Sequence, residues 1–316
     1  MRPAARHGRR VTGALLLDKP RGITSQTAVT HVKRLYSAEK AGHTGTLDPM
    51  AEGLLPVCLG EATKFSHLLL DADKGYLATV KLGLTTSTGD LEGEVQRTVQ
   101  VSVERAAVEQ ALARFTGEIL QTPPMYSALK HAGKRLYELA RAGETVARAP
   151  RRIEIKAIEL IALERDTLHI DILCSKGTYI RVLAEDIGAA LGCGACLAAL
   201  RRTRVGKFQV EDAISLEALQ ASNEAARDAQ LLGVDALVAS LPRVDLEAGA
   251  ARQFAAGREV RHPADAAATE LARIYGPGHR FLGVARVEAG GNLVPRRLMA
   301  SVPLPQDHVL LEKTRS

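Results

Sequence analysis

Aromatic residues are scarce in this sequence. Tryptophan is absent from the 316 residues, and Phe and Tyr together make up only 3% of them. A buried core must therefore be built mainly from Leu, Val, Ile and Ala, which are among the residues most often found inside proteins. Because aromatic residues are so few, a tyrosine in a predicted strand is less readily explained by core packing alone.

Cysteine is scarce too. Cys58, Cys174, Cys193 and Cys196 are too few and too scattered for the disulfide framework of a secreted protein, so we expect a reducing, cytoplasmic location. Cys193 and Cys196 have the spacing of half a zinc site or of a redox pair. No second C-x-x-C and no H-x-x-x-H accompanies them, and a structural zinc ion needs four ligands. We therefore predict that these cysteines are structural and that no metal is bound.

Long hydrophobic runs are missing as well. The first ten residues are basic, but no apolar stretch long enough for a signal-peptide core or a membrane span follows them. We expect a basic N-terminal tail over residues 1–10 and no membrane association.

The hydrophobic fraction of 46% and the charged fraction of 25% are typical of a globular protein. The formal charge of +6 and the pI of about 9.2 favour a polyanionic partner without identifying it.

Hydrophobic periodicity predicts helices and strands that alternate irregularly. Helices are expected over residues 25–36, 103–115, 178–191 and 247–256, with Ser25 as the cap of the first. Strands are expected over residues 76–82, 153–161, 168–174, 281–287 and 293–298, the last two forming a hairpin. Residues 221–242 are Ala-rich and helical in character. The length predicts two units, and the absence of a regular βα repeat favours an α+β fold.

Residues 122–152 differ from the rest of the chain. They open with Pro123-Pro124 and lack sustained apolar periodicity. Their seven cations face two carboxylates, Glu138 and Glu144, which gives a local charge of 7 − 2 = +5. The cations are Lys130, Lys134, Arg135, Arg141, Arg148, Arg151 and Arg152. This composition predicts a basic insertion that projects from the core; the alternative is a solvated surface helix and loop.

The most informative stretch is the loop of residues 42–53, GHTGTLDPMAEG. Asp48 stands there among Gly42, Gly45, Pro49 and Gly53, where the backbone can form tight turns. Because no Lys or Arg lies beside it, Asp48 is a candidate nucleophile or base whose charge partner comes from elsewhere in the chain. The alternative from the residues alone is an Asp that shapes a turn or caps a helix.

This loop resembles the catalytic loop of the TruB family of tRNA pseudouridine synthases. It matches the pattern G-H-x-G-x-L-D-P-x-A-x-G without a gap or a substitution at the defining positions. Further matches follow in family order: Leu17-Asp18-Lys19-Pro20 with Gly22, Thr24 and Ser25; Gly75-Tyr76; Thr122-Pro123-Pro124 with Tyr126-Ser127-Ala128-Leu129-Lys130; Gly177-Thr178-Tyr179-Ile180-Arg181; and Leu200-Arg201-Arg202. The resemblance covers residues 11–210 well and the last third loosely, and on these motifs the chain is identified as a member of the family.

The resemblance implies how the chain is organised. Residues 11–242 would form the catalytic domain, a pseudouridine-synthase-like mixed sheet with flanking helices. Within it, residues 122–152 would form a thumb that grips RNA. Residues 243–316 would form a small β-rich, PUA-like RNA-binding domain, in keeping with the predicted hairpin.

The resemblance also implies the catalytic residues. Asp48 would be the essential carboxylate, acting either as a nucleophile toward the sugar or base or as a base that removes a ribose proton. Arg181 is the candidate partner, because a guanidinium can hold a carboxylate through two hydrogen bonds. Tyr76 would supply the ring on which the flipped uracil stacks, with its hydroxyl near the reacting base.

Other matched residues would contact the RNA. His43 would fill space beside the displaced nucleotide, Tyr179 would meet the target from the opposite side, and Leu200 would form an apolar wall, with ordinary core as the alternative for Leu200. Lys19 would buttress Tyr76, and Asp90 could support the site from behind. Phosphate contacts are expected from the cations Lys130, Arg201, Arg202, Arg204 and Lys207, and such contacts position RNA without reading its sequence.

The activity implied is the isomerisation of uridine 55, in the T-loop of tRNA, to pseudouridine. Uracil is detached from C1′ of its ribose, rotated and rejoined through C5, so no cofactor is required. The nucleotide must be flipped out of its stack. The chain is expected to act as a monomer on the T-arm. The alternative is a non-catalytic RNA-binding or tRNA-folding protein; a glycosidase lacks a second acid in the loop.

Overall fold

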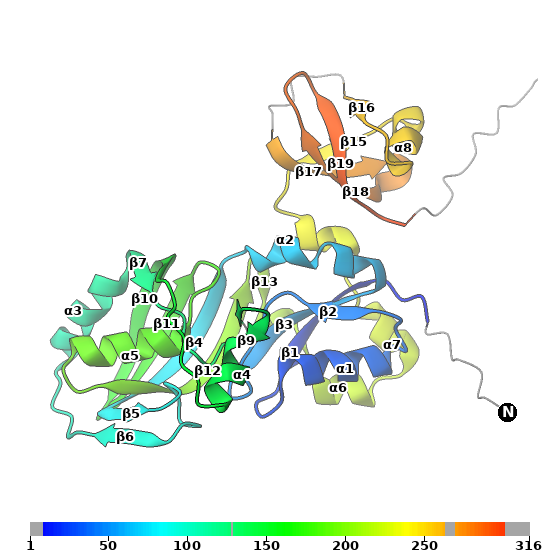
Figure 1. Cartoon of the computed structure of the whole chain (residues 1–316). Coiled ribbons are helices and arrows are strands. Elements are labelled where there is room, and N and C mark those ends of the chain that lie inside the picture. The colour runs from blue at the N-terminus through cyan, green and yellow to red at the C-terminus, as the bar shows by residue number, and fades with distance from the viewer. Residues whose placement is uncertain (1–8, 128, 263–268, 301–316) are drawn as a thin grey trace, which may run out of the picture. The chain divides into compact units, whose positions relative to one another are not determined.

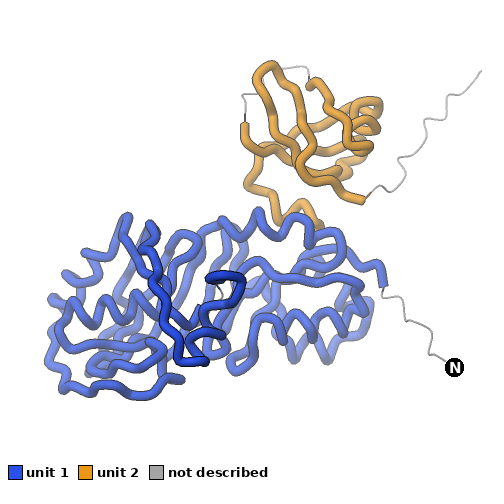
Figure 2. The backbone as a smooth tube through the Cα atoms, in the orientation of Figure 1, with its two compact units in different colours: residues 1–232 blue, residues 233–316 orange. Residues whose placement is uncertain are grey.

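The computed structural model of this chain describes residues 9–127, 129–262 and 269–300. The chain divides into two compact units, residues 1–232 and residues 233–316 (Figure 2). The compact units divide after residue 232, whereas the resemblance implies residue 242 as the end of the catalytic domain. Most of the expected N-terminal tail, Ala128 of the thumb and the last sixteen positions, 301–316, lie outside the described residues.

A mixed sheet forms the centre of the first unit (Figure 1). Its strands follow the order β14-β1-β3-β12-β4-β11-β10-β7, with β2 paired to β3 and β13 paired to β12. Strand β3 runs parallel to β12, and β1 runs parallel to β14, whereas the other neighbours are antiparallel. The strands are β1 (Gly13–Lys19), β2 (Ala41–His43), β3 (Glu52–Leu59), β4 (Lys74–Leu82), β7 (Gly117–Gln121), β10 (Arg151–Glu164), β11 (Thr167–Cys174), β12 (Ala195–Val205), β13 (Phe208–Gln209) and β14 (Ile214–Ser215).

Helices cover one face of this sheet. Helix α1 (Ser25–Leu35) packs near β2 and β3, α3 (Arg105–Phe115) on β10, α5 (Ile180–Ala190) on β12 and α6 (Leu216–Ala221) on β1 (Figure 1). These four helices and the strands share one buried cluster of mainly aliphatic residues, as the scarcity of aromatics predicts. The opposite face of β4 is partly open, because Leu77 is exposed while Tyr76 and Ala78 are buried. The mixed sheet with segregated helices confirms the predicted α+β fold.

Smaller elements complete the first unit. They are α2 (Ser66–Leu70), α7 (Glu224–Ala229), the 3₁₀ helices η1 (Gly60–Lys64) and η2 (Val210–Asp212), and the hairpin of β5 (Leu84–Thr86) with β6 (Val95–Thr98). The thumb, residues 122–152, contains the hairpin of β8 (Lys130–His131) with β9 (Lys134–Arg135), and helix α4 (Leu136–Arg141). Leu136 and Leu139 of α4 are buried, so the basic segment has a small apolar side of its own.

The second unit is small and rich in β-structure. Its sheet follows the order β15-β17-β18-β19-β16 and packs against α8, with Phe254 of α8 at the core. The elements are η3 (Val234–Val238), β15 (Arg243–Asp245), α8 (Ala248–Ala255), β16 (Val260–Arg261), β17 (Thr269–Gly276), η4 (Pro277–His279), β18 (Arg280–Val287) and β19 (Asn292–Leu298). The predicted hairpin is confirmed as β18 and β19.

Two expectations need correction. Thr24 and not Ser25 caps α1, because the Thr24 side chain accepts the N–H of Thr27 at 3.0 Å. The helical character expected over residues 221–242 is interrupted, because Asn223 caps a new short helix, α7, and η3 follows after Gly233. In the part of the chain that the structure describes, none of the helices combines the length and the apolar character needed to cross a membrane.

Candidate active site

Asp48 lies in the loop that joins β2 to β3, at the middle of the sheet. Two backbone bonds shape this loop: the N–H of Gly22 donates to the carbonyl of Pro49 at 2.8 Å, and the N–H of Ala51 donates to the carbonyl of Asp48 at 3.1 Å. Ser25, which is buried, closes the loop from α1. Its hydroxyl accepts the N–H of Leu47 at 2.8 Å and donates to the carbonyl of Leu47 at 3.0 Å. The backbone directly before Asp48 is therefore fixed.

Arg181 meets Asp48 from the first turn of α5. Its Nε donates to Asp48 Oδ2 at 2.9 Å, while Nη1 donates to the carbonyl of Thr88 at 2.9 Å and Nη2 to the carbonyl of Tyr126 at 2.7 Å. The expected pairing is thus present, but through one hydrogen bond to the carboxylate and not two. The other two directions of the guanidinium are held by backbone carbonyls, one of them from the thumb.

A second carboxylate stands behind this pair. Asp90 Oδ2 lies 3.6 Å from Arg181 Nε, and the Asp90 side chain is only 6% exposed. Asp90 Oδ1 accepts hydrogen bonds from the Thr88 hydroxyl at 2.5 Å and from the N–H of Glu92 at 3.0 Å. The buried Arg181 cation is therefore balanced by two carboxylates, which offsets the cost of removing it from water. These contacts place Asp90 behind the Asp48–Arg181 pair, where the sequence analysis expected it.

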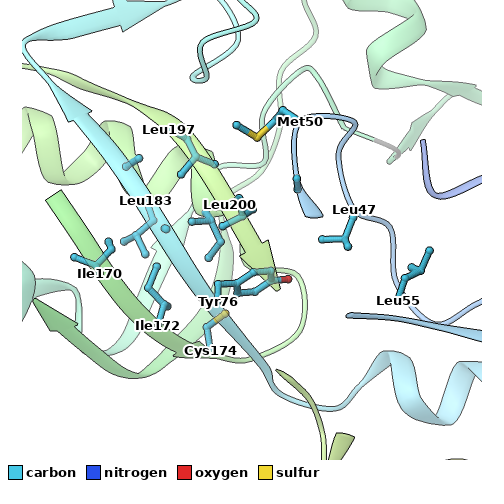
Figure 3. Packing of buried hydrophobic residues seen from close by; sticks show 14 of the residues in the cluster. Leu47, Met50, Leu55, Tyr76, Ile170, Ile172, Cys174, Leu183, Leu197 and Leu200 are labelled. Carbon is cyan, nitrogen blue, oxygen red and sulfur yellow. The ribbon is translucent and has the colours of Figure 1, made fainter. Parts of the chain in front are cut away.

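Tyr76 lies on β4 beside Arg202 of β12, its partner in the strand register. The ring is nearly buried, at 9% exposure, and packs in the same cluster as Leu47, Met50 and Leu200 (Figure 3). Burial raises the pKa of the Tyr76 hydroxyl, and the positive charge of Arg202 opposes that rise. The hydroxyl thus stays protonated at neutral pH. In Figure 3 it points toward the side on which Leu47 lies.

Arg202 is not on the surface. It is 1% exposed, its Nε donates to the carbonyl of Leu54 at 2.7 Å, and its Nη2 donates to the carbonyl of Gly45 at 3.1 Å. The phosphate contact expected for Arg202 does not fit a buried side chain; the residue instead joins β12 to the Asp48 loop. Gly53 makes this approach possible, because its φ is +99° and a Cβ there would lie 2.3 Å from the Arg202 carbonyl oxygen.

Lys19 is completely buried at the end of β1. Its ammonium donates to the carbonyls of Pro20 at 2.9 Å and Ile23 at 2.8 Å. Burial, assisted by the nearby charge of Arg202, lowers the pKa of Lys19 to about 8, and Asp48 and Glu52 oppose that shift. Lys19 is thus held by backbone carbonyls at the end of β1, and its buttressing of Tyr76 stays a prediction.

His43, at the end of β2, and Tyr179, before α5, are both partly buried. The N–H of Gly45 donates to His43 Nδ1 at 3.2 Å, and burial followed by the charge of Arg202 lowers the pKa of the His43 ring. The neutral ring then carries its proton on Nε2. Tyr179 is the residue directly before α5, and burial raises the pKa of its hydroxyl. Leu200 is buried next to Ala78 on the neighbouring strand and belongs to the main hydrophobic cluster.

The remaining predicted cations differ in their availability. Arg201 is held by two carboxylates: its Nη2 donates to Asp18 at 2.7 Å and its Nη1 to Glu52 at 3.2 Å. A phosphate would have to compete with both. Lys130 is exposed on the β8–β9 hairpin of the thumb. Lys130 of the thumb is therefore more accessible to a phosphate than Arg201 is.

A cavity of about 480 Å³ lies between the thumb and α5. Thr88 and Tyr126, whose carbonyls bind Arg181, are part of its wall, together with Arg148 and Glu185.

Within the described residues, no group of three or more His, Cys, Asp or Glu side chains could hold a metal ion. All four cysteines are free and buried.

Sequence reasoning did not indicate two side chains that bond the backbone around the Asp48–Arg181 pair, Ser25 and Gln121. Ser25 lies in a matched motif, and Gln121 directly precedes the matched Thr122-Pro123-Pro124. Their adjacency to motif residues is the signal that could have indicated them. What they bond, however, lies far away in the sequence, at Leu47 and Tyr179.

Comparison with known proteins assigns the chain to the pseudouridylate synthases, a class of isomerases. Within that class the chain belongs to the TruB family, as its motifs predict. Residues 33–180 match the N-terminal domain of the TruB family pseudouridylate synthases. Residues 181–241 match the tRNA pseudouridylate synthase B C-terminal domain, and residues 242–299 match the C-terminal domain of pseudouridine synthase II TruB.

Similar proteins support this assignment. The chain is 54% identical over 302 residues to tRNA pseudouridine synthase B of Aromatoleum aromaticum, covering 95% of this chain and 97% of that protein. It is 53% identical over 305 residues to tRNA pseudouridine synthase B of Burkholderia mallei, covering 95% and 98%. Among solved structures, a Cbf5-Nop10-Gar1 complex matches with a TM-score of 0.72 and 28% identity, covering 90% of this chain and 84% of the matched one. An H/ACA RNP bound to a substrate RNA containing 2′-deoxyuridine matches with a TM-score of 0.71 and 26% identity, covering 93% and 86%.

Proposed function

We propose that this protein converts uridine 55, in the T-loop of tRNA, to pseudouridine, and that Asp48 is the catalytic carboxylate. The observation that carries the proposal is the Asp48–Arg181 pair, in which a half-exposed carboxylate is held by a buried guanidinium. The relatives named tRNA pseudouridine synthase B support tRNA as the substrate.

The reaction assigns a task to each side chain. The uridine leaves its stack and enters between the Asp48 loop and β4, where the Tyr76 ring stacks on the uracil. Asp48 then either attacks the sugar or the base or removes a ribose proton, and in both routes its carboxylate must stay accessible and fixed. Arg181 fixes it, and His43, Tyr179 and Leu200 border the nucleotide.

The RNA outside the site is held by charge. Lys130 and the other thumb cations contact phosphates, Arg201 adds a contact if a phosphate displaces one of its carboxylates, and the second unit contributes as a PUA-like RNA-binding domain. The protein acts as a monomer on the T-arm and uses neither a metal nor an organic cofactor, because the reaction is an internal rearrangement.

The test is incubation of the purified protein with an unmodified tRNA transcript, followed by mapping of pseudouridine at each position. We expect one product, at position 55. The same transcript with cytidine at position 55 is the control and should yield none. Pseudouridine at another position, or RNA binding without any product, would contradict the proposal.

A further inference from the structure

Gln121, the last residue of β7, makes an unusual pair of hydrogen bonds. The N–H of Tyr179 donates to Gln121 Oε1 at 2.8 Å, and Gln121 Nε2 donates to the carbonyl of Tyr179 at 3.1 Å. The Gln121 side chain is 2% exposed. One amide thus bonds both the N–H and the carbonyl of Tyr179, as a neighbouring strand would.

These two hydrogen bonds, the Gln121 clamp, hold the backbone of Tyr179 directly before α5. Tyr179 has an extended backbone, with φ of −100° and ψ of 106°, and the helix starts at the next residue. The carbonyl of Tyr179 also accepts the N–H of Leu183 at 3.1 Å, which is the first bond of the helix. Arg181 is the second residue of α5, so its guanidinium is aimed by the backbone that Gln121 holds.

Gln121 also lies directly before the thumb. Thr122 follows it directly, and Tyr126 of the thumb accepts Arg181 Nη2 at 2.7 Å. The clamp therefore joins the edge of the sheet, the start of α5 and the root of the thumb at one buried point. A shift of any of them would move the guanidinium away from Asp48.

We propose that Gln121 is a positioning residue for the isomerisation, which aims Arg181 at Asp48 by holding the backbone of Tyr179. The proposal rests on the proposed function, since the reaction is its main readout. Misplacement of a reacting group by about 1 Å can cost about 10²-fold in rate. Loss of the clamp should therefore lower the rate far more than it lowers RNA affinity.

Gln121→Glu turns the clamp into one that pH controls. A neutral carboxyl group offers one acceptor and one donor, as the amide does, whereas a carboxylate has no donor and faces the Tyr179 carbonyl. Because the position is buried, the pKa of the introduced carboxyl should lie well above the ordinary value of about 4.3. The clamp should therefore close at low pH and open at high pH.

The experiment compares wild type, Gln121→Leu and Gln121→Glu by single-turnover rates on tRNA between about pH 5 and about pH 9, with RNA affinity and thermal unfolding measured on each. Gln121→Leu should lose about 10- to 100-fold in rate at every pH and keep its RNA affinity within about threefold. Gln121→Glu should match Gln121→Leu at high pH and approach wild type as the pH falls. Asn223→Asp makes the same amide-to-acid change at the cap of α7 and should follow wild type throughout.

A rate for Gln121→Leu within threefold of wild type would overturn the proposal, as would a Gln121→Glu rate that stays a constant fraction of wild type at all pH. A parallel loss of rate, RNA affinity and thermal stability would also overturn it, because that pattern means a structural role alone.

The Arg181 Nε–H resonance in ¹H–¹⁵N spectra of RNA-free protein gives a second readout. It should shift in Gln121→Leu and return in Gln121→Glu at low pH. An inactive wild type would defeat the proposed function, while this resonance would still decide the role of Gln121.

Discussion

Arg181 and Asp48 form an ion pair whose two members differ sharply in exposure. The Arg181 side chain is 5% exposed and that of Asp48 is 40% exposed, although 2.9 Å separates Arg181 Nε from Asp48 Oδ2. The guanidinium can be buried because two carbonyls and Asp90 share the task of balancing it. The carboxylate is thereby held from behind and left open on the side that a ligand can reach.

Asp48→Asn should abolish turnover and leave RNA binding intact. The amide is nearly isosteric and still accepts a hydrogen bond from Arg181, but it can act neither as a nucleophile nor as a base. We expect the single-turnover rate to fall by about 10⁴-fold or more and the free energy of unfolding to change by only about 1 kcal/mol. Asp212→Asn, at an exposed carboxylate of η2, is the control. Comparable turnover by Asp48→Asn would show that Asp48 is structural.

Tyr76→Leu should weaken binding of the flipped base, while Tyr76→Phe should not. Phe keeps the ring and loses the hydroxyl, whereas Leu keeps bulk and loses the π-face, and base–aromatic stacking is worth about 1–3 kcal/mol. Affinity for tRNA and single-turnover rates on both variants test this, with circular dichroism to confirm folding.

The same two variants report on the hydroxyl. Normal binding with slow turnover in Tyr76→Phe would assign the hydroxyl to proton transfer, which its protonated state allows. Near-normal rates for Tyr76→Leu would remove Tyr76 from the active site.

Replacing Lys130, Lys134 and Arg135 with Ala should weaken RNA binding and flatten its salt dependence. All three are exposed on the β8–β9 hairpin, so each can release counterions when it meets a phosphate. The slope of log affinity against log salt should fall by about 2–3 in magnitude. Arg97, Arg105 and Arg114, all exposed on β6 and α3, give a charge-matched triple Ala control. An unchanged slope in the thumb variant would mean that its charges are only solvated.

Lys19 should make stability depend on pH in a defined direction. Its pKa is about 8 in the folded protein against an ordinary 10.5, so between these values the unfolded chain binds the proton and the folded chain does not. The free energy of unfolding should therefore rise with pH in this window, by up to about 1.4 kcal/mol per pH unit from this group.

Urea unfolding of wild type and Lys19→Met between about pH 7 and about pH 10 isolates this contribution, because the other titrating groups are common to both proteins. The wild-type value minus the variant value should increase with pH. Lys33→Met, at an exposed lysine of α1, should give a flat difference. A flat difference for Lys19→Met would contradict the assignment.

Dialysis against a strong chelator should leave pseudouridine formation unchanged. The reaction is an internal rearrangement, and Cys193 and Cys196 were predicted to be structural. The rate before and after dialysis, with and without added zinc, is the measurement. A loss of activity that zinc restores would overturn that prediction.

The fold could be predicted from the sequence where a pattern is local. The apolar residues alternate over residues 76–82 and recur at helical spacing over residues 25–36. Each pattern indicates which side of one element is buried, and β4 and α1 agree with these predictions. The short pieces after residue 221 were not resolved by composition, because Ala favours helix everywhere and the breaks at Asn223 and Gly233 depend on single residues.

The sequence by itself determined the family, since motifs spread over residues 11–210 fix the kinds of side chain that the chemistry needs. Only the tertiary structure decided how those side chains are used. Arg202 could not be recognised as buried, nor Arg201 as paired with Asp18 and Glu52, because a basic run looks the same whether it faces water or carbonyls. The single bond from Arg181 to Asp48, with its other donors turned to Thr88 and Tyr126, and the clamp of Gln121 on Tyr179 join residues tens of positions apart. Such contacts follow from packing, which brings distant backbone groups within hydrogen-bond range, and no local pattern records them.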